Sequence, residues 1–252
     1  MFDLTGHVAI VTGGNGGIGL GMARGLARAG ARVVVAARNE EKSKAAVHAL
    51  CALGSDALAI QVDVSNESSV TALVEETVAR CGRLDILVNN AGMSIRKPAN
   101  ELALAEWRTV IDTNLTSTFL CARAAYPHMK RAGAGKIINL GSMLSIFGAA
   151  FAPAYGASKG GVVQLTKSLA VAWARDNIQV NAVLPGWVDT DLTRQARQTI
   201  PDLNDRILAR SPTGKWGSID DFEGIAVFLA SAASNFITGA AIPVDGGYAS
   251  LA

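Results

Sequence analysis

The chain has 252 residues, of which 50% are hydrophobic and 17% charged, so it can bury a large core, and we expect one domain over residues 1–252. Its 23 Lys and Arg against 21 Asp and Glu leave a net charge of +2 without a basic block, so we expect no nucleic-acid partner. No apolar run approaches the ~20 residues that span a bilayer, and the first residues carry no charged leader, so we expect a cytoplasmic protein with no membrane partner.

The three cysteines, Cys51, Cys81 and Cys121, are odd in number, far apart and outside any CxxC pair. We expect reduced thiols, with neither a disulfide nor a bound metal.

Short β-branched runs alternate with longer helical patterns along the chain. Strands are predicted at 7–12, 31–37, 57–64, 85–90, 136–142, 178–185 and 241–247. Helices are predicted at 21–30, 40–54, 66–82, 156–176 and 218–234. The strands are almost continuously apolar, which is typical of strands covered on both faces. The alternation therefore predicts an α/β fold with a parallel, doubly wound sheet, in which ligands bind beyond the carboxyl ends of the strands.

A glycine-rich stretch, TGGNGGIGLG, follows the first predicted strand directly. Gly13, Gly17 and Gly19 can turn the chain, admit a phosphate close to the backbone and pack the next helix on the sheet. The spacing is TGxxxGxG rather than GxGxxG, and no GK[ST] follows. The position between strand and helix predicts dinucleotide binding, and a tight turn without a ligand is the alternative.

The stretch AYGASKGG at 154–161 places Tyr155 and Lys159 four positions apart. On a helix these positions share one face, and a nearby ammonium group would lower the pKa of a phenol from about 10. A tyrosine that exchanges protons near neutral pH is the resulting hypothesis, and a surface Tyr beside a solvated Lys is the alternative. Farther along, residues 190–216 are more polar than their surroundings and form a candidate substrate lid.

Eight motifs in order resemble the short-chain dehydrogenase/reductase family. They are TGGNGGIG at 12, VDVS at 62, NNAG at 89, DTNL at 112, NLGS at 139, YGASK at 155, LPGWVDT at 184 and VDGG at 244. The resemblance implies a seven-stranded Rossmann-type sheet with helices on both faces, a nicotinamide cofactor, and a catalytic set of Asn114, Ser142, Tyr155 and Lys159.

The resemblance also implies a role for each member of this set. Tyr155 would be the general acid that protonates a carbonyl oxygen, and the general base in reverse. Lys159 would tune Tyr155 and bind the ribose, Ser142 would stabilise the same oxygen, and Asn114 would hold a water that links Lys159 to solvent. The alternatives are a Ser142 hydroxyl that caps its own backbone and an Asn114 amide satisfied within its helix.

The implied cofactor site draws on four segments. By the family pattern, the glycine loop and Tyr155 with Lys159 contact the cofactor, residues after the third and fourth strands contact its adenosine side, and a loop after the sixth strand holds the nicotinamide. The residues are Gly13, Asn15, Gly17, Ile18, Gly19, Asp63, Val64, Asn90, Ala91, Gly92, Pro185, Gly186, Val188 and Thr190.

The end of the second predicted strand indicates which cofactor is preferred. Enzymes that prefer NAD place a carboxylate there for the ribose 2′-OH, whereas a 2′-phosphate needs that carboxylate absent and an Arg present. Ala37 holds this position and Arg38 follows it. We therefore expect NADP(H) as the cofactor. NAD(H) is the alternative, because family members without the usual Asp include NAD users. The simpler interpretation of Arg38 is a solvated charge on a loop.

The substrate prediction depends on a looser likeness. SMLSIFGAAFAPAYGASKGG and the IRKP at 95–98 look like the sugar-acid dehydrogenases of the family, which act on 2-keto-3-deoxygluconate, 2-deoxygluconate or gluconate. Arg96 and Lys97 could then pair with a substrate carboxylate, although such a pair on a loop is often only solvated. The alternatives are a 3-oxoacyl-[acyl carrier protein] reductase and a catalytically silent NADP-binding protein.

The family likeness also implies a homotetramer. Members commonly pair through the helices that bear Asn114 and Tyr155 and through the last strand. The predicted helix 156–176 carries small and apolar residues on more than one face, which a monomer would leave partly exposed.

Overall fold

The strand runs pair into one seven-stranded parallel sheet in the computed structural model, which describes residues 1–251. The strand order is β3-β2-β1-β4-β5-β6-β7. The strands are β1 (Val8–Thr12), β2 (Arg32–Ala37), β3 (Leu58–Gln61), β4 (Ile86–Asn89), β5 (Gly135–Leu140), β6 (Ile178–Pro185) and β7 (Ala241–Val244). The predicted fold class, a single Rossmann-type doubly wound parallel sheet, is confirmed.

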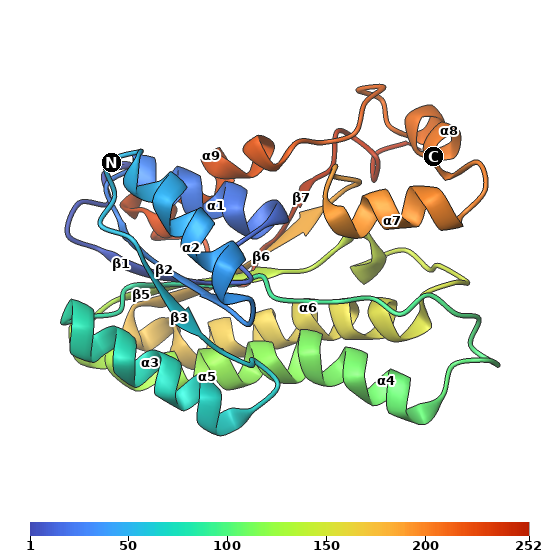
Figure 1. The fold of residues 1–252 in the computed structure, drawn as a ribbon. Coiled ribbons are helices and arrows are strands. Elements are labelled where there is room, and N and C mark those ends of the chain that lie inside the picture. The colour runs from blue at the N-terminus through green and yellow to red at the C-terminus, as the bar shows by residue number, and fades with distance from the viewer. Residues whose placement is uncertain (252) are drawn as a thin grey trace.

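Helices cover both faces of the sheet (Figure 1). One layer holds α1 (Gly17–Arg28), α2 (Glu40–Cys51) and α9 (Glu223–Ala230). The opposite layer holds α3 (Glu67–Cys81), α4 (Leu104–Ile111), α5 (Ser117–Ala132) and α6 (Pro153–Trp173). Within residues 1–251 no helix is both long and apolar enough to cross a lipid bilayer.

The two layers explain why the strands are apolar throughout. In β2, Val33 and Val35 belong to the core under α1 and α9, whereas Val34 and Ala36 belong to the core under α3 and α5. Successive side chains of a strand point to opposite faces, so a strand buried on both faces needs an apolar residue at every position.

The order of the strands reverses at β1, which pairs with β2 on one side and with β4 on the other. The chain therefore leaves β1 and β4 in opposite directions, and a crevice opens beyond their carboxyl ends. The glycine loop follows β1 and Asn90 follows β4, so both motifs lie at this crevice.

The helices differ from the sequence pattern in two places. α4 and α5 lie where the pattern yields no helix. Thr113 and Thr116, between the two helices, and Thr118 and Pro127, within α5, lower helix propensity, yet packing against neighbouring helices stabilises both. The predicted helix 218–234 divides into three shorter elements. The break after α9 arises because Ser231 is extended and its hydroxyl accepts a hydrogen bond from the Ala233 N–H.

The polar segment 190–216 folds into α7 (Asp191–Thr199) and α8 (Leu203–Arg210), which lie beyond the carboxyl end of β6. A small apolar cluster of Ala196, Leu203 and Ile207 joins the two helices. The predicted lid region is thus an ordered pair of helices at the crevice.

Candidate active site

The glycine loop lies so close to its neighbours that side chains would not fit. A Cβ on Gly19 would be 2.3 Å from Asn90 Nδ2 and 2.5 Å from the Gly13 carbonyl oxygen. Gly13 and Gly17 have φ of +65° and +52°, a region that disfavours other residues. α1 begins here without a side-chain cap and without an acidic residue in its first turn, so its N-terminal N–H groups and positive dipole end face the crevice. This cradle fits the diphosphate of a dinucleotide.

Asn90 fixes the shape of this loop from the end of β4. Its Nδ2 donates to the carbonyl oxygens of Thr12 at 2.9 Å and of Gly13 at 3.2 Å. The Thr12 hydroxyl in turn accepts from the backbone N–H groups of Asn90 and Ala91. Asn90 therefore braces the glycine loop, a contact that the sequence does not reveal.

A cleft of about 370 Å³ runs from the glycine loop to the N-terminal end of α6. Most of the predicted site residues line it together, namely Gly13, Asn15, Gly17, Ile18, Asn90, Ala91, Gly92, Ser142, Tyr155, Lys159, Pro185, Gly186, Val188 and Thr190. Of the predicted catalytic and cofactor-binding residues, five do not line it: Gly19, Arg38, Asp63, Val64 and Asn114.

Tyr155 and Lys159 occupy the first turns of α6, which begins at Pro153, so their four-residue spacing does place them on one face. Lys159 Nζ is buried, lies 5.8 Å from the centre of the Tyr155 ring and donates to the Leu140 carbonyl oxygen at 2.6 Å. Ser142 follows β5, and its Oγ accepts from the Leu144 N–H at 3.1 Å. The three side chains thus meet at the floor of the cleft.

The pKa of Tyr155 is raised above its ordinary value, mainly because the phenol is buried. A hydrogen bond with Ser142 and the positive charge of Arg96 both act to lower this pKa. Burial also lowers the pKa of Lys159 to about 8. The expectation that Lys159 lowers the pKa of Tyr155 is therefore wrong for this structure, because the lysine is itself buried and directs its Nζ to Leu140.

Asn114 lies in a π-helical turn, Asp112–Thr116, between α4 and α5. Its Nδ2 donates to the Met93 carbonyl oxygen and to Ser158 Oγ, both at 2.9 Å, and its Oδ1 accepts from the Met93 N–H at 2.8 Å. The amide joins the loop after β4 to α6 beside Lys159. Its partners lie on two other segments of the chain, so the alternative of an amide satisfied within its own helix is not met, and the role of Asn114 in holding a water stays a prediction.

Arg38 is exposed after β2, and its charge contributes to a lowered pKa at Asp63, where hydrogen bonds from Ser65 contribute most. Asn15 Nδ2 reaches across to the Asn39 carbonyl oxygen at 3.3 Å. Lys42, one turn farther along, lines the cleft and pairs with Asp191 of α7 at 3.6 Å. Sequence reasoning missed Lys42, although a second cation four residues after Arg38 was the available signal.

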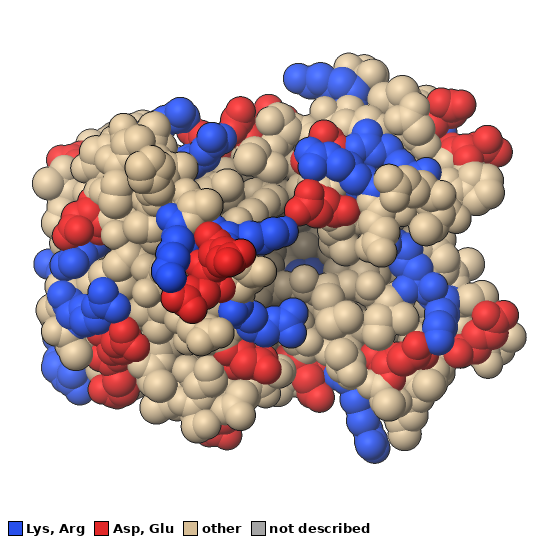
Figure 2. Space-filling view, viewed as in Figure 1, with Lys and Arg blue, Asp and Glu red and all other residues tan. Residues whose placement is uncertain are grey.

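A second cavity, of about 540 Å³, adjoins the cleft and shares Ser142, Tyr155, Pro185 and Gly186 with it. Its other walls come from the loop after β4, the segment before α6, the C-terminal segment, and α7 and α8, which we call the lid helices after the predicted lid region. Figure 2 shows a hollow near the middle of one face with both basic and acidic side chains around it. Among residues 1–251, no Asp or Glu lines this cavity, whereas three arginines do: Arg96, Arg206 and Arg210.

Arg96 and Lys97, predicted as a pair, point to different partners. The Arg96 Nη2 donates to the Leu192 carbonyl oxygen at 3.0 Å, and its charge acts on Tyr155. Lys97 forms an ion pair with Glu106 of α4 and does not line the cavity. The expectation that Lys97 helps to bind a carboxylate is not met, because a carboxylate of the chain already holds its ammonium group.

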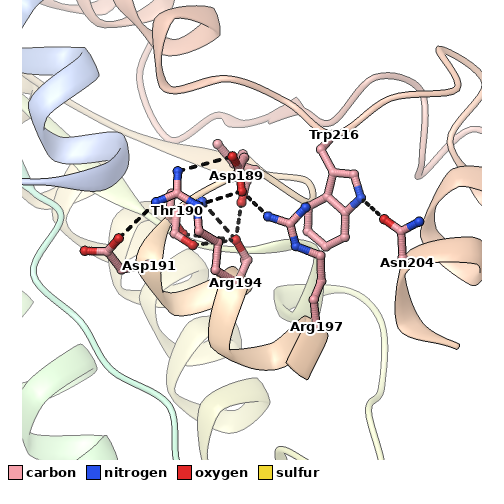
Figure 3. Close-up of polar contacts among 9 residues, drawn as sticks. Asp189, Thr190, Asp191, Arg194, Arg197, Asn204 and Trp216 are labelled. Atoms are coloured by element: carbon pink, nitrogen blue, oxygen red, sulfur yellow. Dashed lines mark hydrogen bonds and ion pairs between the residues drawn. The ribbon is translucent and has the colours of Figure 1, made fainter. Parts of the chain in front are cut away.

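The lid helices are held together by a polar network around Asp189 (Figure 3). Asp189 accepts from Arg194 Nε and Nη2, each at 3.2 Å, and also pairs with Arg197. The Arg197 guanidinium lies 4.4 Å from the Trp216 ring centre, and Trp216 Nε1 donates to Asn204 Oδ1 at 2.9 Å. The network connects both lid helices to the segments on either side of them, which sequence spacing alone does not indicate.

Comparison with known proteins agrees with this geometry. A family model described as enoyl-(acyl carrier protein) reductase matches residues 13–249. The 2-dehydro-3-deoxy-D-gluconate 5-dehydrogenase of Dickeya dadantii is 43% identical, over 98% of this chain and 97% of that protein. The cis-4-hydroxycyclohexanecarboxylate dehydrogenase of Sinomonas cyclohexanicum is 42% identical, over 97% of each chain.

Among solved structures, a gluconate 5-dehydrogenase from Burkholderia cenocepacia J2315 in complex with NADP and tartrate is similar over 100% of this chain and 98% of its own. The sequence identity is 41% and the TM-score is 0.95. The likeness in sequence and structure extends over the whole length of the chain. The glycine cradle and the cluster of Ser142, Tyr155 and Lys159 agree with the family that this likeness indicates. The chain belongs to the short-chain dehydrogenase/reductase family of oxidoreductases.

Proposed function

We propose that this protein is an NADP(H)-dependent dehydrogenase that interconverts a secondary alcohol and a ketone on a small carboxylic acid of the sugar-acid type. The observation that carries the substrate class is the cavity beside Tyr155, which three arginines and no acidic residue line. Such a cavity favours an anionic substrate, because each bound carboxylate would meet only positive charge.

The substrates named for two relatives share one arrangement of functional groups. In a gluconate 5-dehydrogenase the reacting carbon is C5 and the carboxylate is C1, which places four bonds between the two carbons. In cis-4-hydroxycyclohexanecarboxylate the carboxylate carbon is also four bonds from the carbon that bears the hydroxyl. We infer that this chain acts on the same class: a carboxylate with a hydroxyl or keto group four bonds away.

The nicotinamide cofactor supplies or accepts the hydride when it is bound. The Tyr155 hydroxyl gives its proton to the ketone oxygen in reduction and takes the proton of the alcohol in oxidation. The Ser142 hydroxyl, which lines the cleft together with Tyr155, stabilises the charge that develops on the same oxygen. Lys159 binds the ribose and orients the cofactor; its burial and its position in the lining of the cleft support this role.

NADP(H) is the proposed cofactor. The Burkholderia cenocepacia relative was solved in complex with NADP. In this chain Ala37 leaves no carboxylate at the end of β2, the exposed Arg38 follows it, and Lys42 lines the cleft. NAD(H) stays the alternative.

A substrate screen with purified enzyme tests the proposal. We expect the highest kcat/KM for gluconate-type acids and cis-4-hydroxycyclohexanecarboxylate, and lower values for polyols of equal length such as glucitol. Turnover confined to acetoacetyl thioesters would instead support a 3-oxoacyl-[acyl carrier protein] reductase, and binding of NADPH without any turnover would support a silent cofactor-binding protein.

We also propose a homotetramer, with contacts through the α4, α5 and α6 layer and through the segment around β7. The first surface exposes Leu104, Trp107, Phe119 and Val171, and Phe236 near β7 is fully exposed. Apolar patches of this kind are typical of protein interfaces. Trp173 is not part of this patch, because it stacks on Tyr126 at 4.8 Å.

Light scattering at micromolar concentration should give four times the monomer mass. Val171→Glu places a charge on the exposed patch and should reduce the measured mass. A monomer for the native chain would refute the proposal.

The cytoplasmic location and the lid function of residues 190–216 stay predictions.

A further inference from the structure

One side chain of the substrate cavity has an arrangement that its packing alone does not explain. Arg210, the last residue of α8, places its guanidinium carbon 4.4 Å from the centre of the Tyr248 ring and 4.8 Å from that of Phe147. The two rings are 6.2 Å apart at 73° to one another. The guanidinium therefore contacts the faces of two aromatic rings that come from distant parts of the chain.

Arg210 also differs from the arginines near it in its charge partners. On α7, Arg194 and Arg197 both pair with Asp189. Within residues 1–251, no Asp or Glu forms an ion pair with Arg210, and none lines the cavity that it faces. A half-buried cation in a cavity without an acidic residue has its charge available to a ligand.

Stacking on aromatic rings directs how such a cation can bind. The guanidinium carbon lies over both rings, and because the rings are at 73° to one another at most one of them can stack parallel to the planar guanidinium, whose N–H donors lie in its plane and project from its edge. A carboxylate that meets this edge accepts two parallel hydrogen bonds. The rings also restrict the side chain to few conformations, which reduces the entropy lost when a ligand binds.

The other two arginines of the cavity are less suited to the carboxylate. Arg96 lies at the reacting end, because its charge acts on Tyr155 and its guanidinium donates to Leu192. A carboxylate four bonds from the reacting carbon must lie away from Tyr155. Arg206, one turn before Arg210 on α8, is exposed at the mouth of the cavity, where solvent screens its charge.

We propose, on the basis of the proposed function, that Arg210 binds the substrate carboxylate and that Phe147 and Tyr248 position its guanidinium. Arg210 is then the residue that selects acids over neutral alcohols of the same shape. It acts from the lid, so substrate recognition and lid position are linked.

The test compares cis-4-hydroxycyclohexanecarboxylate with its carboxamide, which has the same shape without the charge. Arg210→Met removes the charge and keeps the length of the side chain. We expect it to raise KM for the carboxylate about 10- to 100-fold, the loss typical of a charge-assisted hydrogen bond, and to change the carboxamide kinetics less than about threefold. Arg206→Met removes the same charge one turn away, where the side chain is exposed, and should raise KM for the carboxylate less than Arg210→Met does.

Thermal unfolding and NADPH affinity of each variant show whether the fold and the cofactor cleft are intact. If Arg210→Met does not fold, Arg210→Lys keeps a charge without the planar fork and should still lose most of the preference for the carboxylate. Equal losses on carboxylate and carboxamide would mean that Arg210 only packs, and would overturn the inference while the proposed function stands. Native enzyme that turns over the carboxamide as well as the carboxylate would overturn both.

Discussion

Replacing Tyr155 by Phe should lower turnover about 10²- to 10⁴-fold, the usual contribution of a general acid or base, while NADPH binds nearly as tightly as before. The change removes one hydroxyl and keeps the ring that Lys159 faces at 5.8 Å. Steady-state kcat with a sugar acid and fluorescence titration of NADPH measure the two effects separately. Lys159→Ala, in contrast, should damage both turnover and NADPH binding, because Lys159 also lines the cofactor cleft.

Normal turnover by the Phe variant would show that another group carries the proton. The raised pKa of Tyr155 adds a dependence on pH in the native enzyme. Oxidation needs the deprotonated tyrosine, so its rate should rise as the pH increases toward that pKa. Reduction needs the protonated form, which predominates at neutral pH, so its rate should fall only at the alkaline end.

Replacing Ala37 by Asp together with Arg38 by Leu should shift the ratio of kcat/KM for NADPH and NADH toward NADH by about 10²- to 10⁴-fold. A carboxylate at 37 would repel the 2′-phosphate and accept a hydrogen bond from a 2′-OH, and loss of the guanidinium would remove a charge-assisted hydrogen bond worth ~1.5–3 kcal/mol. The measurement is kcat/KM for both cofactors with one substrate.

Arg80→Leu serves as a matched control for this switch, because Arg80 pairs with Glu76 on α3, outside the cofactor cleft. Its cofactor ratio should equal that of the native enzyme. A native preference for NADH, or a ratio that the double substitution leaves unchanged, would place the selectivity elsewhere, with Lys42 as the next residue to test.

The sequence predicts best those parts of the site whose geometry is local. Tyr155 and Lys159 share a face of α6 because four residues make about one helical turn, and the glycine loop follows β1 directly. Strand 57–64 shows the limit of this approach: its apolar pattern continues to Val64, but β3 ends at Gln61 because β2, its only neighbour, ends at Ala37.

Contacts between distant segments could not be predicted in this way. The ring contacts of Arg210 join residues 147, 210 and 248, and no spacing rule connects them. The pKa of Tyr155 differs from the sequence prediction for the same reason, since it depends on how deeply the fold buries Tyr155 and Lys159. The prediction for Lys97 is wrong because Glu106, nine residues away, folds back to it.

The network around Asp189 joins α7 and α8 into one braced unit. Its interactions run from Asp189 through Arg197 and Trp216 to Asn204, so α7 and α8 are cross-braced and should shift together rather than separately. α7 carries the Leu192 carbonyl that holds Arg96 beside Tyr155, and α8 carries Arg210. A substrate that pulls on one end of this rigid body therefore adjusts the other, and we expect a missing carboxylate to disturb the alignment of the reacting end as well as to weaken binding.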